Sequence, residues 1–75
     1  MAQTELTKGP VHTISQNVSN ALPPGQLRVR SSAAIETSLD ESTWVAVTLT
    51  DGSALVAAPF IRTTAATALV QIGAA

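Results

Sequence analysis

Apolar and polar residues alternate along residues 26–32. Leu27 and Val29 alternate with Arg28 and Arg30, which is the period of a β-strand with one buried and one solvent-facing side. Residues 33–42 then carry Ile35 and Leu39 ahead of a run of acids and Ser. The pattern predicts a strand over 26–32, then a second short strand that ends in an exposed loop.

Residues 44–58 predict a β-hairpin. Asp51-Gly52 is a preferred pair for a two-residue type I′ turn, because both central positions need positive φ. Folding the chain about this turn places one wholly apolar face along both arms. The predicted cross-strand pairs are Thr50 with Ser53, Leu49 with Ala54, Val47 with Val56, and Val45 with Ala58.

The last third of the chain also favours strands. Pro59 ends the predicted hairpin because proline has no amide hydrogen for a ladder. Residues 60–72 are rich in Thr, Val and Ile, which favour strands. A helix over 65–72 is the competing interpretation, since that stretch contains Ala, a strong helix former.

Residues 1–25 predict an extended N-terminal arm. Prolines and glycines stand among Thr, Ser, Asn and Gln, and apolar residues are too sparse for a helical stripe. Val11 to Ile14 can pair as a short strand, and Leu22-Pro23-Pro24-Gly25 sets a turn. We expect this arm to add a strand to a neighbour's sheet edge, so that deleting residues 1–20 leaves a folded domain and weakens attachment.

An internal similarity adds to this pattern. Residues 29–34, Val-Arg-Ser-Ser-Ala-Ala, resemble residues 61–66, Ile-Arg-Thr-Thr-Ala-Ala, and a real repeat would mean two similar β-units packed face to face. The predicted fold is all-β, a small β-sandwich or barrel with an extended N-terminal arm. Its parts are the arm, 1–25, and a small β-domain, 26–75, with a hairpin at 44–58.

Large apolar residues are few in these 75 residues. There are seven Leu, seven Val and four Ile, whereas Ala, Thr and Ser fill 30 positions. A chain this short buries a small share of its surface, and without Cys it has no disulfide. We therefore expect contacts with other chains to complete the core or the sheet, and we expect a homo-oligomer.

Charge excludes several classes of partner. The net charge is −1 and the four basic residues are scattered, which argues against nucleic acid and anionic membranes. Residues 1–10 lack the apolar segment of a secretory signal, and no stretch is long enough to span a bilayer. We expect the protein to be made and kept in a cytoplasm until it is assembled.

Candidate catalytic residues are scarce. His12, the single imidazole, has no neighbouring acid in the sequence, and the glycines do not form a phosphate loop. Glu36, Asp40 and Glu41 lack the spacing of an EF-hand loop, although a divalent-ion site there is an alternative. We predict a non-enzyme with no cofactor and no metal.

Interface residues are the remaining candidates. The arginines either keep a strand edge soluble or pair between subunits with Glu36, Asp40 or Glu41. Trp44 belongs either to the core or to an interface. The candidate interface residues are Val11, His12, Ile14, Arg28, Arg30, Trp44, Leu55, Phe60 and Arg62.

The chain resembles the capsid decoration, or cement, proteins of tailed bacteriophages, especially over 22–38 and 54–75. The similarity lies in the polar arm, the Leu22-Pro23-Pro24-Gly25 entry, the Asp-Gly hairpin, the absence of Cys, and the tracts at 27–32 and 63–68. The resemblance implies a subunit, a trimer by preference, on the capsid surface of the virion. There it binds the major capsid protein and ties neighbouring capsid subunits together.

Two other functions fit the same features. The first is another virion component, such as a tail, fibre or connector module. The second is a small protein-binding regulator directed at a host factor. Purified particles would contain the chain in the first case and lack it in the second.

Overall fold

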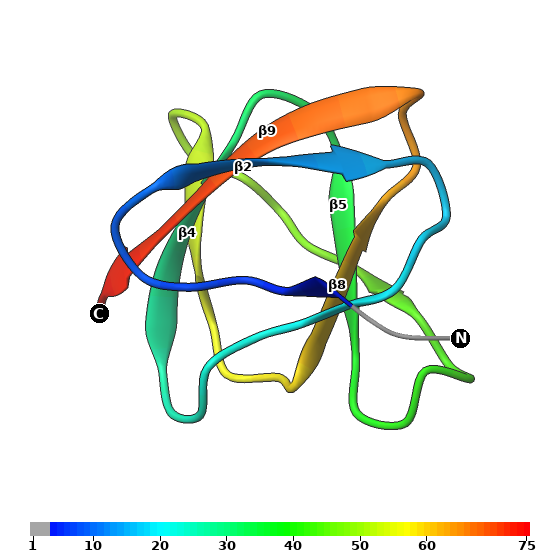
Figure 1. The fold of residues 1–75 in the computed structure, drawn as a ribbon, viewed down its shortest axis with the longest axis horizontal. Helices are drawn as coiled ribbons and strands as arrows, with labels where there is room; N and C mark the ends of the chain where they lie inside the picture. The colour runs from blue at the N-terminus through cyan, green and yellow to red at the C-terminus, as the bar shows by residue number, and fades with distance from the viewer. Residues whose placement is uncertain (1–3) are drawn as a thin grey trace.

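The computed structural model describes residues 4–75, which form two β-sheets packed face to face (Figure 1). Over this range there are nine strands and no helix, so no helix there could cross a membrane. The predicted all-β class is confirmed. The strands are β1 Thr4–Glu5, β2 Val11–Ser15, β3 Asn20–Ala21, β4 Leu27–Ser31, β5 Ile35–Ser38, β6 Val45–Ala46, β7 Ser53–Val56, β8 Phe60–Thr63 and β9 Thr67–Ala74.

The chain passes repeatedly from one sheet to the other. The five-stranded sheet has the order β1-β3-β8-β5-β6, and the four-stranded sheet has the order β2-β9-β4-β7. All neighbouring strands are antiparallel except β1 and β3. In Figure 1, β2 and β9 lie side by side, as their pairing requires.

The core lies between the sheets and follows the strand period. In β4, Leu27 and Val29 are buried and the arginines are exposed, as the alternation predicts. In β9, Val70 and Ile72 are fully buried, whereas Leu69 is 53% exposed. The helix proposed for 65–72 is therefore wrong, because this period-two burial outweighs the helical propensity of alanine.

The N-terminal segment is extended, as predicted, but residues 4–25 are part of the domain. β2 pairs with β9 over its full length, and β3 pairs with β8. Leu6, Ile14 and Leu22 are 3%, 2% and 9% exposed and belong to the core cluster. The division into a 1–25 arm and a 26–75 domain does not describe these residues, because three of the core's aliphatic side chains come from the arm.

The Asp51-Gly52 turn is confirmed, but the hairpin predicted on it is not. Asp51 and Gly52 have φ of 53° and 79°, and Thr50 and Ser53 exchange backbone hydrogen bonds of 2.8 and 3.1 Å. Beyond that pair the two arms separate, because β6 pairs with β5 and β7 pairs with β4. The predicted apolar face still turns inward, and Val47 packs against the core.

The two similar segments have the same local structure. Each ends a strand and then carries the chain to the other sheet, from β4 to β5 and from β8 to β9. At each corner a side-chain hydroxyl accepts a hydrogen bond from the amide two residues later: Ser31 from Ala33 at 3.3 Å, and Thr63 from Ala65 at 3.1 Å. β4 pairs with β9 and β5 with β8, so the two corner units interlock.

Candidate functional site

The two long sides of the sandwich differ in how they are closed. On one side the N-terminal segment runs along the opening and places Leu6 and Ile14 in the core. On the other side, β6 is the edge strand of one sheet and β7 is the edge strand of the other, and the two do not pair. This second side is an open seam.

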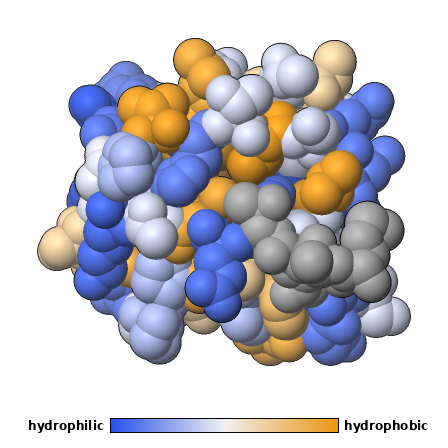
Figure 2. Space-filling model, viewed as in Figure 1, coloured by the Kyte–Doolittle hydropathy of each residue, from blue (hydrophilic) through white to orange (hydrophobic). Residues whose placement is uncertain are grey.

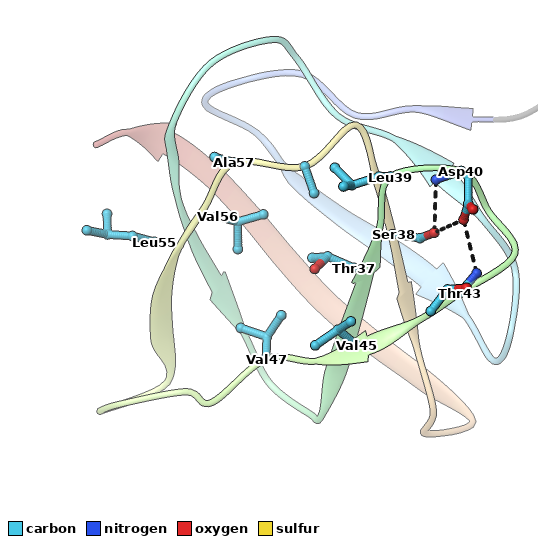
Figure 3. A pocket seen from close by; sticks show the side chains of 11 residues that line it. Thr37, Ser38, Leu39, Asp40, Thr43, Val45, Val47, Leu55, Val56 and Ala57 are labelled. Atoms are coloured by element: carbon cyan, nitrogen blue, oxygen red, sulfur yellow. Dashed lines mark hydrogen bonds between the residues drawn. The ribbon is translucent and has the colours of Figure 1, made fainter.

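An apolar groove of about 380 Å³ lies in the open seam (Figure 3). Val45, Val47 and Val56 point toward its centre, and Leu55 points away from it. Most of the lining comes from β5, β6, β7 and the short segments next to them. The lining residues are Thr37, Ser38, Leu39, Asp40, Thr43, Val45, Val47, Leu55, Val56, Ala57 and Ala58.

The groove is an uncovered part of the interior. Val45 lies opposite Thr37 in the ladder, on the inner side of its sheet, yet it is 61% exposed. Leu39, just beyond β5, is 77% exposed. Both residues would bury apolar surface if a side chain from outside entered the seam, which favours association.

The strands beside the seam also have free backbone groups. Val47 donates its amide hydrogen to the Ile35 carbonyl at 3.0 Å, so the alternation of an antiparallel ladder directs the amide and carbonyl of Ala46 away from β5. The bond from the Ser31 amide to the Gly52 carbonyl, at 2.9 Å, sets the same alternation between β4 and β7. In this alternation the amide and carbonyl of Leu55 point away from β4, toward the open seam. An added strand has hydrogen-bonding partners here.

A loop at residues 38–43 forms one end of the groove and is held by its own side chains. One Asp40 carboxylate oxygen accepts hydrogen bonds from the amides of Ser42 and Thr43, at 2.9 and 3.0 Å, and from the Ser38 hydroxyl at 3.0 Å. The Ser38 hydroxyl in turn accepts from the amides of Asp40 and Glu41. These bonds fix the groove wall that carries Leu39.

Hydrogen bonding lowers the pKa of Asp40 below its ordinary value, chiefly through the Thr43 amide and then through the Ser42 amide and the Ser38 hydroxyl. The folded loop therefore prefers the ionised carboxylate. Its stabilising effect is present above the unfolded pKa and is lost as pH falls through the lower folded value.

The amide resonances of Ser42 and Thr43 are therefore expected to report the titration of Asp40. In an NMR pH titration both should shift together, with a midpoint below the range of an unperturbed aspartate. Asp40→Asn should remove this transition. A midpoint in the ordinary range would show that the carboxylate does not hold the loop.

Trp44 and Arg62 form a cluster with Glu36 on the outer side of the five-stranded sheet. The Arg62 Nε lies 2.8 Å from the Glu36 Oε1, and the guanidinium carbon lies 4.4 Å from the centroid of the Trp44 ring. Arg62 thus pairs with a carboxylate of its own chain, and not with one of another subunit as the sequence also allowed. Trp44 is half-buried beneath this arginine, so it has cover without a second subunit.

The remaining acids near this end of the molecule have separate partners. Glu41 accepts a hydrogen bond of 2.6 Å from the Ser19 hydroxyl, while Glu36 pairs with Arg62. Within residues 4–75, no group of three His, Cys, Asp or Glu side chains is placed to hold a metal ion. The alternative of a divalent-ion site at Glu36, Asp40 and Glu41 has no support from this arrangement.

His12 joins the N-terminal segment to the four-stranded sheet. Its Nε2 accepts a hydrogen bond of 3.1 Å from the Thr7 amide, and the ring is half-buried. An imidazole whose acceptor nitrogen is already used by the backbone is occupied structurally.

Arg28 and Arg30 lie on the outer side of the four-stranded sheet, and both are exposed. The interpretation that they keep a sheet edge soluble is wrong, because β4 is an interior strand with β9 and β7 on either side. Lys8 lies nearby, since it bridges to Ile72 of β9 and lines the same depression as both arginines. We call Lys8, Arg28 and Arg30 the basic face.

The predicted interface residues are spread over several environments. Leu55 is 50% exposed beside Arg28, and Val11 is 57% exposed in the row of Arg30. Phe60 is half-buried, and Ile14 lies in the core instead. Leu39 and Val45 as groove residues, and Lys8 as part of the basic face, were not predicted. Their roles depend on which strands diverge and which loops cross them, and no local sequence pattern indicates either.

The side of the molecule seen in Figure 2 carries hydrophobic residues as separate spots among hydrophilic ones. Comparisons of the chain with protein-family models, with curated proteins and with solved structures give no match.

Proposed function

We propose that this chain is a structural accessory protein of a virion, which binds the assembled capsid lattice and stabilises it by bridging neighbouring major capsid subunits. The observation that carries the proposal is the open seam. In this seam, inner-side residues such as Val45 are left uncovered between two edge strands that do not pair with each other. Such a site is suited to receive a side chain or a strand from another protein.

The rest of the fold supports a binding role rather than catalysis. The single histidine is engaged with the backbone of Thr7, and the acids Glu36, Asp40 and Glu41 each have their own partner. The resemblance to decoration proteins supplies the class of partner, the location on the capsid surface, and the preference for a trimer. Binding to the folded state also stabilises a small domain by mass action.

Co-sedimentation with purified particles tests this proposal. We expect the chain to sediment with assembled capsids in a fixed ratio to the major capsid protein, and to remain in the supernatant when the capsid subunits are dissociated. The lattice dependence is expected because a bridging protein needs two neighbouring subunits at a fixed spacing.

Two outcomes would contradict the proposal and favour its alternatives. Recovery of the chain only in the tail or connector fraction, after heads and tails are separated, would identify another virion component. Absence from particles, together with a stable complex with a host protein, would identify a regulator.

A further inference from the structure

Three of the chain's four basic side chains lie close together on the outer side of the four-stranded sheet. Within residues 4–75 the observed ion pair joins Arg62 to Glu36, which leaves Lys8, Arg28 and Arg30 as cations without a carboxylate partner. Arg28 and Arg30 are two residues apart on one strand and therefore project from the same side of the sheet. Lys8 reaches that side from the N-terminal segment.

A shallow depression of about 250 Å³ lies among these three cations. Gly73, which has no side chain, is opposite Arg28 in the ladder, and Gln71 is opposite Arg30. The Gln71 side-chain amide is turned toward the N-terminal segment, where it donates a 2.8 Å hydrogen bond to the Gly9 carbonyl. The neighbouring positions thus leave room beside Arg28 for an incoming anionic group.

We propose that the basic face binds an acidic, extended segment of a protein partner, in which acidic residues alternate with other residues. The inference rests on the proposed function, in which that partner is a capsid subunit. Side chains two residues apart on a strand repeat at about 6.8 Å, so alternate carboxylates of an extended segment have the spacing of Arg28 and Arg30. The planar fork of arginine suits a carboxylate.

The chain's own acids are poor occupants of this face. Asp40 is held by three donors of its own loop, Glu41 by Ser19, and Glu36 by Arg62. Within the part of the chain that the structure describes, Glu5 and Asp51 have no such partners, but no two acids of the chain are two residues apart, so a second copy has no alternating acidic pair to offer. A foreign segment is therefore the better match by charge.

A nucleic acid fits the basic face less well than an acidic peptide. Sites for single strands combine cations with aromatic side chains that stack on bases. The two aromatic residues, Trp44 and Phe60, are associated with the five-stranded sheet instead, where Trp44 packs against Arg62 and Phe60 begins β8. The apolar neighbours of the arginines are Leu55 and Val11.

The basic face and the groove are separate surfaces that meet at β7. Leu55 of β7 lines the groove and is also the ladder partner of Arg28. One capsid subunit could therefore occupy the seam while an acidic segment of its neighbour lies across β4 and β9. This arrangement gives bridging a structural basis.

Peptide binding by the purified chain tests the inference without particles. The probe is a labelled peptide of about eight residues that alternates Glu and Thr, with both ends blocked, measured by fluorescence anisotropy at low salt. We expect Arg28→Gln with Arg30→Gln to weaken binding roughly tenfold. A peptide alternating Gln and Thr should bind at least that much more weakly to the unaltered chain.

Thr13→Glu with Ser15→Glu is the matched control, because it changes the net charge by the same amount on an exposed part of the same sheet. This control variant should bind the acidic peptide more tightly than the arginine double variant does.

Equal losses of affinity in both double variants, or equal binding of the Gln–Thr peptide, would overturn the proposal. Tighter binding of an oligothymidylate than of the acidic peptide would also overturn it. Loss of peptide binding with intact co-sedimentation would reject this inference and leave the proposed function standing.

Discussion

Deletion of residues 1–20 is expected to unfold the chain, and not to leave a folded domain as the sequence alone predicts, because these residues supply part of the core and an edge strand. The deletion removes Leu6 and Ile14 from the core, and it removes β2, which pairs with β9 over five residues. Each large aliphatic side chain lost from a core costs about 2–5 kcal/mol. A domain of this length has a total stability of about 4–11 kcal/mol, so the loss is comparable to the whole free energy of unfolding.

Far-UV circular dichroism and the dispersion of a proton–nitrogen NMR spectrum measure this outcome. The single substitution Ile14→Ala should lower the free energy of unfolding by about 2–5 kcal/mol. The matched control Leu69→Ala should change it by less than about 0.5 kcal/mol, because Leu69 is 53% exposed. A truncated chain that still unfolds cooperatively would show that residues 4–20 are a dispensable arm.

Val45→Asp is expected to weaken attachment to particles while the domain stays folded. Val45 points into the groove and is 61% exposed, so a charge there meets water in the free chain and apolar surface in the complex. Burying an unpaired carboxylate is strongly unfavourable. We expect the affinity for particles to fall at least tenfold, which corresponds to about 1.4 kcal/mol.

Val18→Asp serves as the control for this substitution. Val18 is 44% exposed and lies outside both the groove and the basic face, so the variant carries the same new charge at a site with no assigned role. Thermal denaturation of both variants measures whether the fold persists. Equal particle affinities for the two variants would remove the groove from the interface.

Local features of the fold could be predicted from the sequence because they depend on neighbouring residues. The alternation at 26–32 identified Leu27 and Val29 as buried, and the Asp51-Gly52 pair identified a turn with positive φ at both positions. The side on which a residue lies follows from the period of a strand. The inward direction of Val45 and Val47 was accessible in the same way.

The pairing partners of the strands could not be predicted by the same reasoning. A turn specifies its first cross-strand pair, here Thr50 with Ser53, but the ladder beyond depends on which edges are available elsewhere. Residues 45–46 pair with β5, and residues 53–56 pair with β4. The groove exists because of this separation, so the candidate site was missed together with the pairing.

The N-terminal segment was misjudged for a related reason. Leu6, Ile14 and Leu22 each enter the core from a different passage across the molecule. A passage that contributes one buried aliphatic residue has no periodicity to detect. Sparse apolar residues therefore indicated an arm, although together they close one side of the sandwich.

Cryo-electron microscopy of purified particles, after incubation with the chain, is the most direct test of whether the open seam is a binding site. We expect density for the chain on the outer capsid surface, with a capsid side chain or strand between β6 and β7 and the chain in contact with two neighbouring subunits. A chain bound to the capsid with this seam open to solvent, or particles with no density for the chain, would contradict this expectation.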